Sequence, residues 1–166
     1  DKHLIFDEIK DQVLMLMNDV FGNYVVQKLL DHGLPQHKLI LTNALSGNIL
    51  KLALQMYGCR VVQRVLEFCT PKQKGPVLQE ILQGCKELIL DQYGNYVIQH
   101  ILTRGTSENR NFVIGTVQDN ILEFSRHKFA SNVVEKALQN SSPDNRSKLI
   151  LSILEPGANG FCPLQT

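Results

Sequence analysis

The stretch DQYGNYVIQH, residues 91–100, decides the fold because the chain repeats it. Close variants follow one another at a spacing of 36 residues: DVFGNYVVQK from Asp19, QMYGCRVVQR from Gln55 and HKFASNVVEK from His127. Self-similarity at a period of about 20 to 50 residues is typical of solenoids, in which each unit buries its apolar face against its neighbours. The sequence therefore predicts a stack of four repeats.

Apolar residues recur at the same five positions of every copy, and we interpret these columns as the core. Within one copy, Val25, Val26, Leu29 and Leu30 follow the spacing of a helix with one broad apolar face, although valine locally favours strands. The columns are Leu16, Leu52, Leu88 and Phe124; Phe21, Tyr57, Tyr93 and Phe129; Val25, Val61, Val97 and Val133; Val26, Val62, Ile98 and Val134; and Leu30, Leu66, Leu102 and Leu138.

Helical patterns also precede and follow this segment, as in NILKLALQ before it and KGPVLQEILQ after it, so each repeat contains three helices. The predicted fold is all-α, a curved, right-handed α-solenoid of three-helix, 36-residue repeats over residues 1–155. An irregular tail follows at 156–166. We expect recognition helices, the middle helices of the repeats, near 21–32, 57–68, 93–104 and 129–140.

Small residues and prolines mark the ends of these helices. A small residue at the start of the middle helix permits a close helix approach, and proline is tolerated in the first turn of the third helix. The small residues are Gly22, Gly58, Gly94 and Ala130, and the third helices are predicted to begin near Pro35, Pro71, Ser107 and Pro143.

The amino-acid composition limits the classes of protein to which this chain can belong. The 166 residues are 43% hydrophobic with a net charge of +1, which suits one folded domain and does not indicate a polyanion partner from global charge. No apolar run approaches the roughly 20 residues that cross a bilayer, and the first ten residues lack signal-peptide features. We expect a soluble, cytoplasmic protein without a membrane partner.

The cysteines and histidines predict no metal, cofactor or catalytic site. Cysteines do not stand at zinc-ligand spacing, and histidines form no recurring pair with a nucleophile or carboxylate. These residues are Cys59, Cys69, Cys85 and Cys162, and His3, His32, His37, His100 and His127. We therefore expect neither a disulfide framework nor an enzyme.

Three polar positions of the middle helix vary in a restricted way. Residues i and i+4 project together from a helix, whereas residue i+1 lies roughly 100° round the axis. Two side chains could therefore reach the edge of an unstacked base while the third covers its face. The sets are Asn23, Tyr24 and Gln27; Cys59, Arg60 and Gln63; Asn95, Tyr96 and Gln99; and Ser131, Asn132 and Glu135.

The chemistry of each pair suits a different base. The amides of Asn and Gln match a pyrimidine edge that carries both donors and acceptors. The carboxylate of the Ser and Glu pair only accepts, which suits the two adjacent donors of guanine, and the smaller Cys and Gln pair fits adenine.

The blocks FGNYVVQ, YGCRVVQ, YGNYVIQ and FASNVVE resemble the recognition helices of the Pumilio/PUF family of RNA-binding proteins. The resemblance implies binding of single-stranded RNA, one base per repeat and antiparallel to the chain. It also implies mRNA 3′ untranslated regions as targets, post-transcriptional regulation of translation, and regulatory proteins on the convex face.

Carried over to the matching positions, the resemblance implies a core of 5′-GUAU-3′, part of a UGUA-type element. The base-edge readers would be Asn23 and Gln27 for U, Cys59 and Gln63 for A, Asn95 and Gln99 for U, and Ser131 and Glu135 for G. The stacking residues would be Tyr24, Arg60, Tyr96 and Asn132.

A basic column follows the second edge reader: Lys28, Arg64, His100 and Lys136. Each residue is i+4 from the stacker, so a phosphate contact is one interpretation and an ordinary solvated helix face is the other.

The family typically has eight repeats with divergent caps, whereas four are recognisable here. Uncapped repeats leave their end faces exposed. A fragment, a short family member and a design all fit this pattern, and uncapped ends would allow self-association.

The alternative function is a helical-repeat scaffold for protein–protein interaction, of the kind that armadillo or HEAT-like solenoids provide. A scaffold would not distinguish GUAU from GUGU RNA.

Overall fold

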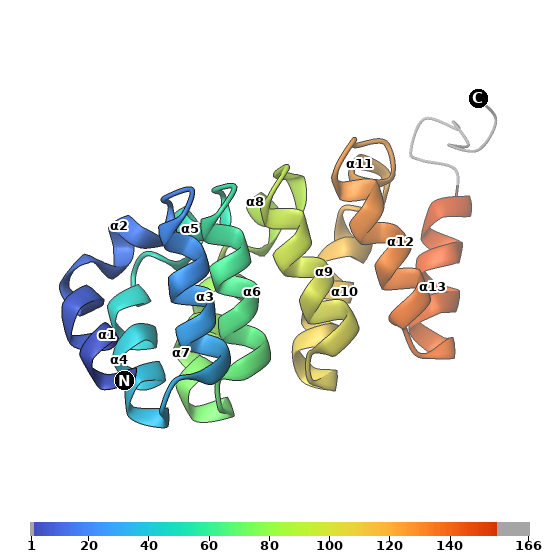
Figure 1. Ribbon diagram of the computed structural model, residues 1–166. Helices are drawn as coiled ribbons and strands as arrows, with labels where there is room; N and C mark the ends of the chain where they lie inside the picture. Colours follow the sequence, from blue (N-terminus) through green and yellow to red (C-terminus); the bar gives the residue numbers. More distant parts are fainter. Residues whose placement is uncertain (1, 156–166) are drawn as a thin grey trace. The chain divides into compact units, whose positions relative to one another are not determined.

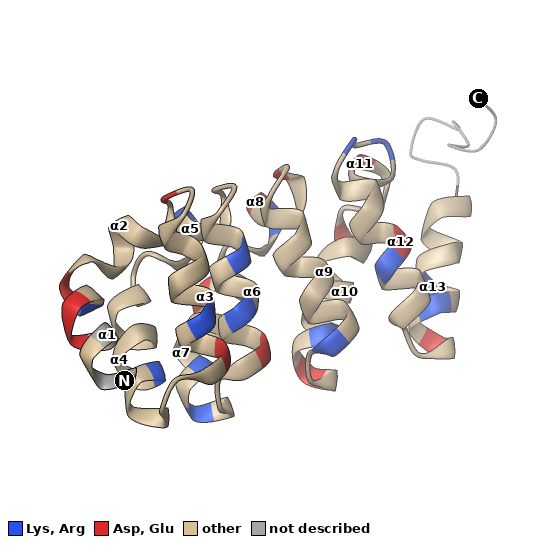
Figure 2. Cartoon of the chain, viewed as in Figure 1, with Lys and Arg blue, Asp and Glu red and all other residues tan. Residues whose placement is uncertain are grey.

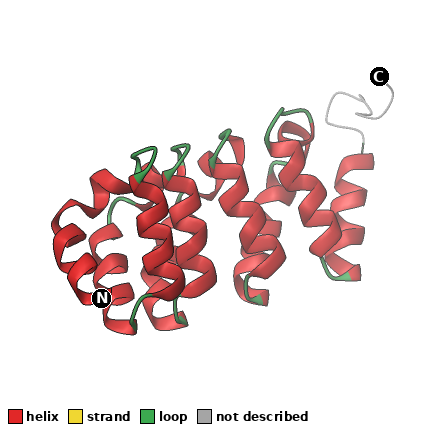
Figure 3. Ribbon diagram, viewed as in Figure 1, coloured by secondary structure: helices red, strands yellow, loops and turns green. Residues whose placement is uncertain are grey.

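The computed structural model describes residues 2–155, and the predicted tail 156–166 lies outside the described residues. Within residues 2–155 the structure consists of helices and connecting turns, with no strand (Figure 3). The elements are α1 (Lys2–Ile9), the 3-10 helix η1 (Lys10–Gln12), α2 (Val13–Met17), α3 (Gly22–His32), α4 (Pro35–Leu45), α5 (Ile49–Ala53), α6 (Gly58–Phe68), α7 (Pro71–Gln83), α8 (Cys85–Leu90), α9 (Gly94–Arg104), α10 (Ser107–Asp119), α11 (Ile121–Ser125), α12 (Ala130–Asn140) and α13 (Pro143–Leu154).

The chain forms two compact units, Asp1–Gly84 and Cys85–Thr166, and each contains two repeats (Figure 1). A repeat consists of a short first helix, a middle helix of 11 residues and a third helix of 11 to 13 residues. The prediction of an all-α fold built from three-helix repeats is confirmed. No helix of the described part is long and apolar enough to span a membrane.

Equivalent helices of successive repeats pack side by side within each unit. In the first unit α3 packs against α6 and α4 against α7, and in the second α9 packs against α12 and α10 against α13. Each unit therefore has a layer of middle helices and a layer of third helices, and the short first helices contact both layers. This packing places two middle helices next to each other in each unit.

The predicted core columns are largely buried. Val26, Val62, Ile98 and Val134, which form one column, are all buried.

The core prediction is wrong at two positions of the first repeat, and the other aromatic residues aligned with Phe21, which are Tyr57, Tyr93 and Phe129, are only partly buried. Phe21 is 80% exposed and Val25 is also exposed. The equivalent Val61 and Val133 are fully buried in helices that pack against the middle helix of the preceding repeat. No repeat precedes α3 within the described residues, so Phe21 and Val25 lack that cover.

The glycine that begins the middle helix in the first three repeats is required by a close backbone approach, as predicted. A Cβ atom at Gly22, Gly58 or Gly94 would lie 2.9, 2.5 or 2.8 Å from a backbone carbonyl oxygen of the preceding helix. Such distances are shorter than real contacts, so the glycine lets the middle helix begin directly beside the first helix.

The third helices begin at the residues predicted for them, which are Pro35, Pro71, Ser107 and Pro143. Three of these helices have a hydroxyl cap on the preceding residue, since Thr70, Thr106 and Ser142 each accept a backbone N–H from the third residue of the helix.

The cysteines of the described part are buried and form no disulfide: Cys59, Cys69 and Cys85, with Cys162 lying outside the described residues. Burial raises the pKa of the Cys85 thiol to about 11, against a small opposing effect of the Thr116 hydroxyl. Between residues 2 and 155 the structure places no group of three or more His, Cys, Asp or Glu side chains that could hold a metal ion.

Substitution of Gly58 tests the close approach. Gly58→Ala forces a methyl group to 2.5 Å from the Leu52 carbonyl oxygen, so we expect the free energy of unfolding to fall by about 1 to 3 kcal/mol. Gly75→Ala is the matched control, because a Cβ there meets nothing within 4 Å and alanine should stabilise α7 by about 0.5 to 1 kcal/mol. Urea denaturation of both variants checks this, and equal stability of the two would contradict it.

Alkylation of Cys85 tests its environment. Because the thiolate is the reactive form, the raised pKa predicts slow modification of Cys85 by iodoacetamide from pH 7 to 9 in the folded protein. Peptide mapping by mass spectrometry measures the rate, and the same chain unfolded in guanidinium chloride is the control. A folded-state rate as fast as the unfolded one would show that the thiol is not buried.

Candidate nucleic-acid interface

The predicted site residues lie on the four middle helices, α3, α6, α9 and α12. All four predicted stackers point to solvent: Tyr24 and Tyr96 are 55% and 56% exposed, and Arg60 and Asn132 are exposed as well. Exposure of this much aromatic ring in the first turn of a helix leaves a face against which a planar group can stack.

The two predicted asparagine readers are buried, which differs from the expectation that both edge readers project together. Asn23 and Asn95 are 0% and 1% exposed. The Nδ2 atom of Asn23 donates to the carbonyl oxygens of Asp19 and Val20 at 2.8 and 2.9 Å. Both of its N–H donors are therefore used by the turn that enters α3.

Asn95 makes the same bonds in the third repeat, with Nδ2 donating to the carbonyl oxygens of Asp91 and Gln92 at 2.8 and 3.0 Å. In both repeats the asparagine Oδ1 accepts a hydrogen bond from the glutamine one turn on. The Nε2 to Oδ1 distance is 2.9 Å for Gln27 and 2.8 Å for Gln99. Only the glutamine of each pair is partly exposed.

The other two repeats have a different arrangement. The buried Cys59 donates its thiol to the Met56 carbonyl oxygen at 3.3 Å, and the partly buried Ser131 donates its hydroxyl to the Lys128 carbonyl oxygen at 3.4 Å. Glu135 is exposed and accepts from Gln139 Nε2 at 3.4 Å, while Gln63 is partly buried. The carboxylate of the fourth repeat is thus open to solvent.

Residues that the sequence analysis missed hold the start of these helices. Asp19 Oδ2 accepts the N–H groups of Phe21 and Gly22 at 2.8 and 2.7 Å, and Asp91 Oδ2 does the same in the third repeat at 2.7 and 2.8 Å. The N–H groups of Gly22 and Phe21 lower the pKa of the Asp19 carboxyl below its ordinary value. The sequence carried one signal for these aspartates. Each is an N-cap residue type that stands two positions before an aromatic residue and three before the glycine that begins the middle helix.

His127 occupies this position in the fourth repeat. Its Nδ1 accepts the N–H groups of Phe129 and Ala130, each at 3.2 Å. The imidazole therefore acts through an unprotonated Nδ1, and its role in the turn matches that of the two carboxylates.

The four residues of the basic column have different environments in the structure. Arg64 faces the protein: Nε donates to Gln27 Oε1 at 3.4 Å, and Nη1 lies 3.9 Å from Asp31 and 3.8 Å from Glu67. The positive charge of Arg64 therefore has two acidic partners within the first unit. Lys28 is exposed, whereas His100 and Lys136 are partly buried.

Charges on the middle helices are mainly basic (Figure 2). These helices carry five Lys or Arg and three Asp or Glu residues, although the whole chain has a net charge of only +1. The basic residues are Lys28, Arg60, Arg64, Arg104 and Lys136, and the acidic residues are Asp31, Glu67 and Glu135.

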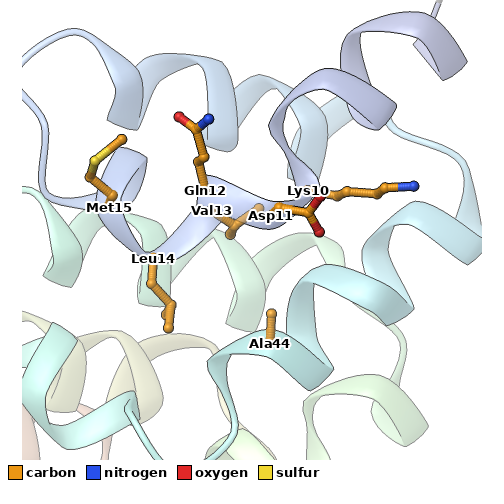
Figure 4. Close-up of a pocket in the computed structure, with 7 residues that line it drawn as sticks. All are labelled: Lys10, Asp11, Gln12, Val13, Leu14, Met15 and Ala44. Atoms are coloured by element: carbon orange, nitrogen blue, oxygen red, sulfur yellow. The ribbon is translucent and has the colours of Figure 1, made fainter.

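A pocket lies elsewhere, beside η1, α2 and α4 (Figure 4). It is lined by Lys10, Asp11, Gln12, Val13, Leu14, Met15 and Ala44, and none of these is a predicted site residue. The candidate interface is therefore a helix surface, distinct from this pocket.

Known proteins with similar sequences and structures share this repeat. The model of the Pumilio-family RNA binding repeat matches residues 12–46, 48–82, 84–115 and 120–154. Pumilio homolog 1 of Xenopus laevis is 43% identical over 48 residues, which are 29% of this chain and 4% of that protein.

Two solved structures resemble most of the chain. PUF-8 in complex with PBE-RNA has a TM-score of 0.89 and 34% identity, over 96% of this chain and 47% of that one. The Puf3 RNA binding domain bound to a Cox17 RNA 3′ UTR recognition sequence has a TM-score of 0.81 and 39% identity, over 90% of this chain and 45% of that one. The chain spans about half the length of these solved relatives. On the four matched repeats, together with the three-helix units, this chain belongs to the Pumilio family of RNA-binding repeat proteins.

Proposed function

We propose that this chain binds single-stranded RNA sequence-specifically, with one base for each repeat and a preferred core of 5′-GUAU-3′. The observation that carries the proposal is the pairing, on α3 and α9, of an exposed tyrosine ring with a glutamine amide whose orientation is set by a buried asparagine. The ring supplies a stacking surface and the amide supplies a hydrogen-bonding edge. Solved relatives that are named as RNA-bound support the same use of the fold.

The base order follows from the chain order. Within the first unit α3 is assigned U and α6 is assigned A, and within the second unit α9 is assigned U and α12 is assigned G. Antiparallel binding, as the family resemblance implies, then gives 5′-AU-3′ for the first unit and 5′-GU-3′ for the second.

The excess of basic side chains on the middle helices favours a polyanion at this surface. We assign phosphate contacts to Lys28 and Lys136, with His100 as a further candidate. We leave Arg64 out of this set in the free protein, because its guanidinium group contacts Gln27 and lies within 4 Å of Asp31 and Glu67.

The proposed biological role is that of a cytoplasmic binding module, rather than an enzyme, that regulates mRNAs through their 3′ untranslated regions. Regulatory proteins would bind on the face opposite the RNA. The exposed Phe21 and Val25 on the first repeat provide an apolar surface for the proposed self-association through the ends.

Selection from a random RNA pool with this chain tests the proposal directly. Enrichment of GUAU is the expected outcome. Enrichment of an unrelated motif would contradict the base assignment, and recovery of no motif would contradict sequence-specific binding.

Glu135→Gln tests reading of guanine. Since the carboxylate accepts from two adjacent donors of guanine, we expect the variant to lose about tenfold or more of its preference for GUAU over AUAU RNA. Asp144→Asn removes an equal charge from the exposed surface of α13 and is the control. Fluorescence anisotropy with both RNAs measures the ratio, and an unchanged ratio in the Glu135 variant would exclude this contact.

Tyr96→Ala tests stacking. Loss of the exposed ring should weaken binding of GUAU by about 1 to 3 kcal/mol while the preference among bases at that position stays the same. Phe112→Ala is the control, because Phe112 is similarly exposed but lies on the third helix α10. If Tyr96→Ala selectively weakened U relative to C, Tyr96 would be an edge reader instead.

A further inference from the structure

The solvent-facing side of the third-helix layer in the first unit carries exposed apolar residues. Leu4 on α1 and Leu39 and Ile40 on α4 are 67%, 45% and 47% exposed, and Pro76 on α7 is exposed as well. Leu4, Ile40 and Pro76 stand 36 residues apart in the sequence, so they occupy equivalent positions on α1, α4 and α7. We call the surface formed by Leu4, Leu39, Ile40 and Pro76 the outer band.

A missing neighbour does not explain the exposed apolar residues of α4. On one side of α4 lies α1, whose Phe6 ring stacks on the His37 ring of α4 with the ring centroids 4.3 Å apart. On the other side α4 packs against α7. Leu39 and Ile40 therefore face solvent from a helix that already has a neighbouring helix on each side.

The part of α7 that is equivalent to these two residues has no bulky side chain. Gly75 and Pro76 occupy the positions of Leu39 and Ile40 there. Glycine and proline are the least favourable residues in helix interiors. A Cβ atom at Gly75 would meet nothing within 4 Å, so packing within the protein does not require this glycine. Two residues that disfavour a helix thus leave room on the surface of α7 for an incoming side chain, which is typical of a functional surface.

The charges on α4 and α7 are mainly positive. These helices carry one acidic residue, Glu80, and three basic residues, Lys38, Lys72 and Lys74. The Glu80 carboxylate accepts two backbone N–H groups beside the start of α5. Within residues 2–155 none of the three lysines forms an ion pair, and Lys72 is exposed. By contrast, α10 and α13 of the second unit carry three basic and three acidic residues, so only the first unit favours an acidic partner at this layer.

The spacing within the outer band suits an α-helix laid across α1, α4 and α7. Packed helices lie about 8 to 10 Å apart, which sets the separation between Leu4, Ile40 and Pro76. Seven residues of an α-helix rise about 10.5 Å. A crossing helix with apolar residues at positions i, i+7 and i+14 therefore meets all three side chains with one apolar face.

We propose that the outer band is the docking site for an acidic amphipathic helix of a partner protein. The apolar face of that helix covers the outer band, and its Asp or Glu residues lie over α7 beside Lys72. Asp7 and Glu8 on α1 repel acidic residues at the opposite end, which fixes the direction in which the helix lies. In terms of the proposed function, on which this assignment rests, a regulatory protein binds here while RNA binds on the middle helices.

A designed peptide tests the docking site on the full chain. The probe is a fluorescein-labelled helix of about 18 residues, with leucine at i, i+3, i+7, i+10 and i+14, glutamate at the other positions of its first two turns and alanine elsewhere. In one control peptide lysine replaces glutamate, and in a second the same residues are scrambled. Fluorescence anisotropy measures binding. We expect saturable binding of the glutamate peptide, with a Kd of about 10 to 100 µM, and about tenfold weaker binding of both controls.

Variants of exposed residues locate the bound peptide. Ile40→Ser should weaken binding of the glutamate peptide by about tenfold or more, because it removes the central apolar contact. Gly75→Gln should also weaken it, by filling the open surface of α7, while the free energy of unfolding does not fall, since glutamine is a better helix former. Lys72→Glu should reverse the preference between the glutamate and lysine peptides. Phe112→Ser, at the equivalent exposed position of α10, is the matched control and should leave peptide binding unchanged.

Three results would overturn this assignment. The first is no saturable binding of the glutamate peptide, or equal binding of the scrambled one. The second is unchanged peptide affinity in both Ile40→Ser and Gly75→Gln. The third is a dimer of the unsubstituted chain, seen by sedimentation, that Ile40→Ser abolishes, which would assign the outer band to a second copy of this chain.

Binding of GUAU RNA to the same proteins separates this assignment from the proposed function. We expect Ile40→Ser to bind the RNA as tightly as the unsubstituted chain does. Tight RNA binding by a chain that does not bind the glutamate peptide would contradict only the docking site. Loss of RNA binding in Ile40→Ser would place the RNA on the third-helix layer and contradict both proposals.

Discussion

The close contact between the first and middle helix of each repeat is the constraint on which the rest of the structure depends. In the first three repeats a glycine at the start of the middle helix allows the backbones to approach, and in the first, third and fourth repeats a side chain accepts backbone N–H groups of the same turn. These contacts hold the turn that connects the first helix to the middle helix. Because the middle helix begins at this turn, its polar residues project at the same height in each repeat of a unit.

The same turn supplies the chemistry of the proposed interface. Its carbonyl oxygens lie about one helical turn before the first predicted edge position, where they accept from an asparagine amide, a cysteine thiol or a serine hydroxyl. The first residue of each predicted edge-reading pair is therefore part of the helix entrance.

Much of the fold could be predicted from the sequence because the apolar, glycine and proline positions recur at a spacing of 36 residues. This recurrence is visible in the sequence without any knowledge of tertiary contacts. The exposed Phe21 and Val25 were wrongly assigned to the core because alignment of the repeats does not show whether a neighbouring helix covers a given position. Asp19, Asp91 and His127 were missed because their side chains differ in type. The two aspartates carried an N-cap signal in the sequence, whereas the equivalent role of His127 appears only when the distances to the backbone N–H groups are known.

The sequence by itself determined that the chain is a helical repeat, where each middle helix lies, which three positions vary and which family the pattern resembles. Only the tertiary structure decided which of the varied side chains reach solvent. Asn23 and Asn95 are buried because the carbonyls of the preceding turn satisfy them, and the partly exposed Arg64 donates to Gln27, which lies 37 residues earlier in the chain. Burial and hydrogen-bond partners depend on how distant segments pack, which helical periodicity does not specify.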